Sequence, residues 1–131
     1  MATWKELRSH ISSNYKLMDG TQEEIVSMVF ELEGRSQLVF VGLEEHPSWG
    51  QWAQISSMIG SLPQVDLKAA CIAASKLGIG GIIVREGMDQ VFLSHSIPLE
   101  NVDINEFEDP LEILCMAADA MERKFTGKDE Y

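Results

Sequence analysis

The chain has few of the residues from which disulfide frameworks, metal sites and membrane spans are built. Among its 131 residues are two cysteines, three histidines and four prolines. No apolar run approaches the roughly 20 residues that a helix needs to cross a bilayer. The first residues lack a cationic region followed by an apolar one, so we expect no secretory signal and a cytoplasmic location. Length predicts a single domain over residues 1–131.

Cysteine and histidine also lack the spacings of functional sites. Cys71 and Cys115 fall on apolar positions of expected helices and form no Cys-x-x-Cys, so we expect reduced, structural thiols. His10, His46 and His95 lie on separate segments, without a metal-ligand spacing such as His-x-x-x-His. We therefore expect no catalytic residue, no metal and no cofactor. A small enzyme whose site gathers these histidines with carboxylates is the remote alternative.

Basic residues are scarce as well. Ten Lys and Arg stand against twenty-one Asp and Glu, and the net charge of −11 disfavours binding to nucleic acid or to an anionic membrane. Residues 100–131 alone hold ten acidic and three basic residues, a net charge of −7. This surplus indicates a solubilising face on the last helix. A docking surface for a basic partner is the alternative interpretation.

What the chain does contain is a series of apolar segments rich in Val, Ile, Phe and Trp, which suit a pleated and partly buried surface. Gly34 lies between the first two segments, where a hairpin turn needs a positive φ. Tight turns between neighbouring segments favour an antiparallel sheet. A helix over residues 48–59 is the rival interpretation for the third segment. The five expected strands cover residues 25–32, 38–43, 52–59, 79–85 and 90–96.

Apolar residues at spacings of three and four predict three helices. Thr3 and Glu6 form a capping box for the first, and either Asp103 or Asp109 caps the last. The chain is expected to turn at residues 19–20 after a brief extended piece. The helices cover residues 3–12, residues 64–77 and a final stretch to about residue 125, after which the end frays. The predicted fold is therefore α+β, a five-stranded antiparallel sheet with three helices in the order α-β-β-β-α-β-β-α.

Both faces of the expected sheet carry apolar side chains near the strand centres. A small sheet with one helical layer should show a cleaner polar face, so we expect the second face to be covered. The cover is another helix, a second subunit or a bound partner. One hypothesis is that an extended peptide adds to the sheet as a strand, in a groove lined by Trp49, Trp52, Met28 and Met58. Ordinary core packing is the alternative for each of these four residues.

The second expected helix carries a narrow stripe of small apolar residues. Leu67, Ala70, Cys71 and Ala74 recur at helical spacings. Small side chains allow close approach, so this stripe is a candidate contact between two copies of the chain. Packing of the helix on the sheet of its own chain is the alternative.

In its element order the chain resembles the class I, or Tir-chaperone type, type III secretion chaperones and their sensory-transduction-regulator relatives. Residues 80–125 carry the resemblance. A glycine-led strand, a charged turn, a strand that ends in Ser96-Ile97-Pro98-Leu99, then Val102-Asp103 and a long amphipathic helix follow one another there. The family implies a cytoplasmic homodimer without enzymatic activity, which holds an extended segment of a secreted protein. Residues 46–49, with Trp49 and the nearby Trp52, have no counterpart that we can place in the family pattern.

The resemblance also implies two sets of contact residues. The partner polypeptide would lie against Trp4, Leu7, Val29, Val39, Val41 and Trp52. The subunit contact would be built by Leu67, Ala70, Cys71, Ala74, Ile82 and Val84. Fold alone does not transfer a role, so a standalone regulatory or structural domain of the same fold, without secretion cargo, is the alternative.

Overall fold

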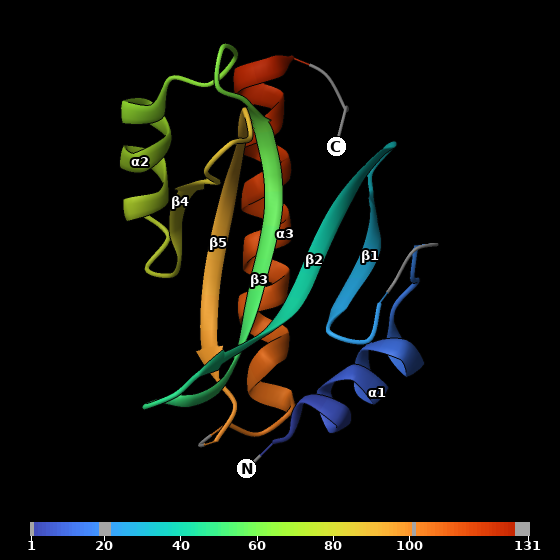
Figure 1. The fold of residues 1–131 in the computed structure, drawn as a ribbon. Coiled ribbons are helices and arrows are strands. Elements are labelled where there is room, and N and C mark those ends of the chain that lie inside the picture. Colours follow the sequence, from blue (N-terminus) through green and yellow to red (C-terminus); the bar gives the residue numbers. More distant parts are fainter. Residues whose placement is uncertain (1, 19–21, 101, 128–131) are drawn as a thin grey trace.

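The computed structural model describes residues 2–18, 22–100 and 102–127 (Figure 1). They form three helices and one five-stranded antiparallel sheet in the expected order, so the predicted α+β fold class is confirmed. The turn expected at residues 19–20 and the end at residues 128–131 lie outside the described residues. The elements are α1 (Trp4–Asn14), β1 (Ile25–Leu32), β2 (Arg35–His46), β3 (Gly50–Ser61), α2 (Leu67–Ser75), β4 (Gly81–Val84), β5 (Gln90–Pro98) and α3 (Asn105–Thr126).

The strands lie in the sheet in the order β1-β2-β3-β5-β4, with every neighbouring pair antiparallel. Gly34 has the positive φ of +71° expected for the first hairpin turn, between the paired residues Leu32 and Arg35. The strands β2 and β3 have twelve residues each and are longer than predicted. The rival helix over residues 48–59 is wrong, because this segment pairs with strands on both sides.

The N-terminal end agrees with the prediction for the first helix and differs from it for the other two. The cap of α1 is confirmed, since the Glu6 N–H donates to Thr3 Oγ1 at 3.2 Å. The helix α2 begins later than predicted because Asp66 caps it, accepting from the Ala69 N–H at 3.1 Å. The N-cap of α3 is Ile104, which places neither Asp103 nor Asp109 at that position and leaves Pro110 inside the helix.

All three helices pack on one face of the sheet, which we call the helix face. Figure 1 shows α3 running along β3 and β5, with α1 and α2 at opposite margins. Buried residues alternate along β1 and β2, and in register with them the buried Ala53, Ile55 and Leu93 lie on this face. No helix of the described residues is both long and apolar enough to span a bilayer. The core joins helix residues such as Leu7, Ile11, Ala70, Ala74, Phe107, Leu111 and Leu114 to sheet residues such as Val26, Met28, Val39, Val41, Ile55 and Leu93.

Both edges of the sheet have neighbours. The expected extended piece before β1 is present, since the Met18 N–H donates to the Ser27 carbonyl and the Val29 N–H donates to the Lys16 carbonyl. These bonds, with the bridge between Leu17 and Met28, occupy part of the outer edge of β1. At the other edge β4 has only four residues and packs beside α2 (Figure 1).

Buried polar side chains replace the strand ladder where β2 leaves β3. Paired residues of these two strands end at Phe40 and Ser56. Beyond this point Gln37 Nε2 donates to Ser57 Oγ at 2.7 Å, and Ser57 Oγ donates to the Leu38 carbonyl. Gln37 and Ser57 are fully buried, so these bonds satisfy groups that water cannot reach.

Three carboxylates of α3 hold the first half of the chain. Arg35 Nε lies 3.0 Å from Asp119 Oδ1, and Arg35 Nη2 lies 3.3 Å from Glu122 Oε1. Asp119 and Glu122 are both buried. Near the start of α3, Glu108 binds the imidazole of His10 and the hydroxyl of Tyr15. Part of the acidic surplus of residues 100–131 is therefore used inside the protein, which neither interpretation of this surplus anticipated.

We predict that Arg35→Met destabilises the fold by about 3–5 kcal/mol, because it removes the largely buried cation that pairs with two buried carboxylates. The matched control is Arg123→Met, since Arg123 also pairs with Asp119 but is 61% exposed. This control should cost less than about 1 kcal/mol. Urea unfolding followed by circular dichroism measures both changes. Equal losses in the two variants would contradict the role assigned to Arg35.

Candidate functional site

The side of the sheet opposite the helices, which we call the open face, is covered by none of the helices described above (Figure 1). Alternation along the strands places Val29, Phe40, Trp52 and Met58 on this face, because their sequence neighbours are buried on the helix face. The sequence predicted apolar residues on both faces. The structure confirms that pattern and leaves the second face without a helical cover.

A row of small residues crosses the open face from one edge to the other. Cross-strand pairing joins Ser27 to Phe40, Phe40 to Ser56, Ser56 to Ser94 and Ser94 to Gly81. Four of the five members have a side chain no larger than a hydroxymethyl group. Ser56 is only 2% exposed although no helix covers it, because larger neighbours rise around it. The row therefore forms a floor that runs across the strands.

Large apolar residues stand along one side of this floor. The next row of the open face pairs Val29 with Leu38, and further along it pairs Met58 with Phe92 and Phe92 with Ile83. Apart from Phe92, which is buried, these side chains are partly exposed. Small residues beside large ones create a depression in a sheet surface that would otherwise be flat.

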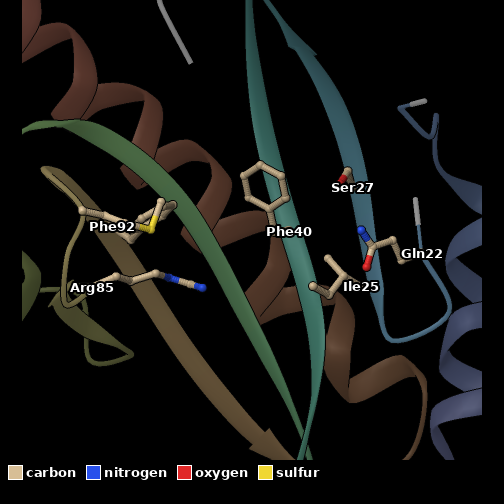
Figure 2. Close-up of a pocket in the computed structure, with 7 residues that line it drawn as sticks. Gln22, Ile25, Ser27, Phe40, Arg85 and Phe92 are labelled. Atoms are coloured by element: carbon tan, nitrogen blue, oxygen red, sulfur yellow. The ribbon is translucent and has the colours of Figure 1, made fainter. Parts of the chain in front are cut away.

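A hollow of about 280 Å³ lies over one part of this floor, and Figure 2 shows most of its lining. Ile25 comes from β1, whereas Arg85 and Met88 follow β4 at the opposite edge. In a flat five-stranded sheet these edges would be roughly 19 Å apart, at about 4.8 Å for each strand spacing. Residues of both edges line one hollow because the sheet curls around its open face. The lining consists of Gln22, Ile25, Ser27, Phe40, Arg85, Met88 and Phe92.

A second hollow of about 210 Å³ adjoins the first. The two share Ile25, Phe40 and Arg85, so they form one continuous depression, which we call the groove. In Figure 2 the Arg85 side chain extends over the face toward Phe40 and Ile25. The second hollow is lined by Ile25, Phe40, Gly42, Leu43, Glu44, Gln54, Ser56 and Arg85.

The groove contains one positive and one negative side chain. The guanidinium carbon of Arg85 lies 5.1 Å from the centroid of the Phe92 ring, a cation–π distance. Glu44 Oε1 is buried and has no hydrogen-bond partner among the described residues. The other oxygen of this carboxylate lies 3.6 Å from His46 Nε2. The groove is thus mostly apolar, with hydroxyl groups on its floor and two charges that a ligand can use.

The structure separates the predicted partner contacts into two groups. Val29 and Trp52 lie on the open face and are partly exposed. The remaining four lie in the core between helices and sheet, where a partner polypeptide does not reach them, because α1 and α3 cover that face. These four are Trp4, Leu7, Val39 and Val41.

The four residues expected to line a peptide groove are also divided between surfaces. Met58 and Trp52 lie on the open face, but Met28 is fully buried on the helix face. Trp49 is 72% exposed in the turn between β2 and β3, where its ring centroid lies 6.0 Å from that of His46. The floor residues could not be identified from the sequence, because the serines form a row only when the strand register is known.

The predicted subunit contacts are divided in the same way. Ala70 and Ala74 face the core of their own chain, so they are not available to a second copy. Leu67, Cys71 and Val84 are exposed, and Ile82 is partly buried. The exposed side of α2 also carries Ile72, which sequence reasoning did not select.

The histidines have different surroundings and do not form a joint site. His10 contacts Glu108, and His46 packs between Trp49 and Trp52. His95 is partly buried, and desolvation lowers its pKa from the ordinary value. Within residues 2–18, 22–100 and 102–127, no three His, Cys, Asp or Glu side chains are grouped so that they could hold a metal ion.

A scan against protein-family models finds no match to this chain, and a search of the curated proteins finds none either. The functional conclusion below therefore depends on the geometry of the open face.

The two thiols should differ sharply in reactivity. Cys71 is exposed, whereas Cys115 is 1% exposed, and burial together with the nearby Asp119 carboxylate raises the pKa of Cys115 to about 12. Because the thiolate is the nucleophile, we expect Ellman's reagent at pH 8 to modify one thiol in the folded chain, at concentrations low enough that it is a single copy, and the second only after unfolding. The Cys71→Ser variant should lose the folded-state reaction. Rapid modification of both thiols before unfolding would contradict the burial of Cys115.

Proposed function

We propose that this chain is a noncatalytic binding module whose open face holds an extended segment of a partner polypeptide. The observation that carries this proposal is the groove, which crosses a sheet face that none of the described helices covers. Apolar surface left uncovered in this way is typical of binding sites.

The shape of the groove favours an extended polypeptide. It consists of two adjoining hollows of about 280 and 210 Å³ that share three lining residues. Two adjoining hollows of this size accept successive side chains of one extended chain. Methionines at the rim and beside the floor, Met88 and Met58, adapt to side chains of different shapes.

The proposed segment lies across the strands on the open face and does not extend the sheet. Strand addition needs a free edge, but Lys16–Met18 occupy part of the edge of β1, and β4 is short and packs beside α2. The floor of small residues crosses the strands in the same direction. The hypothesis of a groove that binds by strand addition is therefore replaced by binding across the face.

The resemblance to class I type III secretion chaperones supports the same kind of ligand, because that family holds extended polypeptide segments. We include the secretion-chaperone role in the proposal on this basis. A standalone domain of the same fold without cargo differs from it by having no polypeptide ligand. The geometry described above favours neither this alternative nor a small enzyme.

The proposal predicts that the open face, and not the outer side of α3, binds unfolded polypeptide. The probe is fluorescein-labelled reduced and carboxymethylated lactalbumin, with binding followed by fluorescence anisotropy. Ile25→Asp puts a carboxylate into the apolar groove and should weaken binding at least about tenfold. The matched control is Ile113→Asp on α3, because Ile25 and Ile113 are 44% and 43% exposed.

Two results would contradict this proposal. The first is equal weakening by Ile25→Asp and Ile113→Asp, since the binding surface would then not be the groove. The second is absence of binding by the unmodified protein up to about 1 mM, a concentration at which even an affinity of about −4 kcal/mol is detected.

We also infer that the exposed side of α2 contacts a second copy of the chain. Leu67, Cys71 and Ile72 lie next to one another on this side, and Val84 is exposed on the adjacent β4. Leu67 and Cys71 are one helical turn apart, so their side chains form a continuous apolar surface. A self-complementary contact of this kind produces a closed two-fold dimer.

The dimer is tested by Ile72→Glu, which places a charge on the proposed contact. Sedimentation equilibrium should give the unmodified protein a mass of twice the 14.6 kDa chain. The variant should shift toward the mass of one chain, because a glutamate buried without a partner is costly. Ile113→Glu is the control and should leave the mass unchanged. A monomeric unmodified protein, or a dimer that tolerates Ile72→Glu, would contradict this contact.

A further inference from the structure

Among the described residues, one basic side chain lines the groove. Because the rest of the chain is acidic, this side chain is expected to attract an anionic group of a ligand. Arg85 is the one basic side chain among the residues that line both hollows. The chain as a whole has a net charge of −11, so most of its surface repels anions. An anionic group on a ligand bound in the groove is therefore attracted to Arg85.

The guanidinium of Arg85 is available to a ligand. Across the described parts of the chain it makes no ion pair or side-chain hydrogen bond, and its guanidinium carbon lies 5.1 Å from the centroid of the Phe92 ring. The ring excludes water from one side of the guanidinium, which strengthens a charge-assisted hydrogen bond on the other side. Figure 2 shows the side chain extended over the face, and it lines both hollows.

We propose that the polypeptide segment held in the groove carries a carboxylate side chain that pairs with Arg85, between apolar side chains that enter the two hollows. This inference rests on the proposed function. In an extended segment, side chains two residues apart point to the same side and lie roughly 7 Å from each other. The recognised pattern is therefore an acidic residue with an apolar residue two positions before it and another two positions after it.

Glu44 favours a polypeptide over an aliphatic carboxylate as the source of this anion. Glu44 lines the second hollow, and its buried Oε1 lacks a hydrogen-bond partner among the described residues. A peptide backbone supplies an N–H at nearly every residue, and one of these can donate to Oε1. A fatty acid bound to Arg85 offers no such donor along its chain. An unsatisfied buried oxygen costs free energy, so a ligand that satisfies it is preferred.

Two peptides that differ by one neutralised carboxylate test this inference. Both are nine residues long with an amidated C-terminus and an N-terminal fluorescein, and valine and serine alternate along them. The central residue, in register with the valines, is glutamate in one peptide and glutamine in the other. Anisotropy titrations compare the unmodified protein with Arg85→Gln and with the control Arg123→Gln, which removes an exposed charge on α3.

The unmodified protein and Arg123→Gln should bind the glutamate peptide about fivefold more tightly than the glutamine peptide. Arg85→Gln should bind both peptides equally, and added salt should reduce the preference of the unmodified protein. Equal binding of both peptides by the unmodified protein overturns the inference, and so does a preference that survives in Arg85→Gln. In these two cases the peptides still bind, so the proposed function stands.

Failure of the unmodified protein to bind either peptide also overturns the inference. Binding of the unfolded lactalbumin probe then shows whether only the recognition pattern or also the proposed function is wrong. If lactalbumin binds and the peptides do not, only the recognition pattern is wrong. If neither the peptides nor lactalbumin bind, the proposed function is wrong as well.

Discussion

The ion pairs between Arg35 and the carboxylates of Asp119 and Glu122 are the interaction on which the position of the first hairpin depends. Both carboxylates are buried, and buried charges are tolerated only when they are paired. They hold the turn end of the β1–β2 hairpin against α3, beyond the point where β2 leaves β3. At the other end of α3, Glu108 holds His10 and Tyr15. The last helix thus fixes how the N-terminal half of the chain lies on the sheet.

The packing of all three helices on the helix face determines which side chains the open face presents. With α1, α2 and α3 on one side, the other side keeps its apolar side chains uncovered by helices. Ser27, Ser56 and Ser94 align across the strands, and Ser27 and Ser56 line the hollows beside Phe40 and Arg85. The groove is therefore a product of strand register and of one-sided helix packing. It does not depend on any motif that is contiguous in the sequence.

The fold could be predicted because its signals are local. Alternating apolar residues, the glycine at the first turn and the Thr3 cap each act within a few residues, and all were interpreted correctly. The binding surface could not be predicted in the same way. Val29 and Val39 look alike in sequence, yet pairing of Val29 with Leu38 places them on opposite faces. The start of α2 could not be predicted either. Gln64 lies before the helix, where its side-chain oxygen accepts hydrogen bonds from the N–H and the hydroxyl of Ser61.

The covered edges of the sheet have a consequence for how the molecule behaves at high concentration. Exposed strand edges are templates on which identical chains polymerise into amyloid-like fibrils. Here the hydrogen-bonding groups of Ser27 and Val29 are already used by Lys16 and Met18, and the opposite margin offers a strand of four residues. The chain can therefore expose an apolar sheet face and still lack the long unpaired strand edge from which fibrils grow.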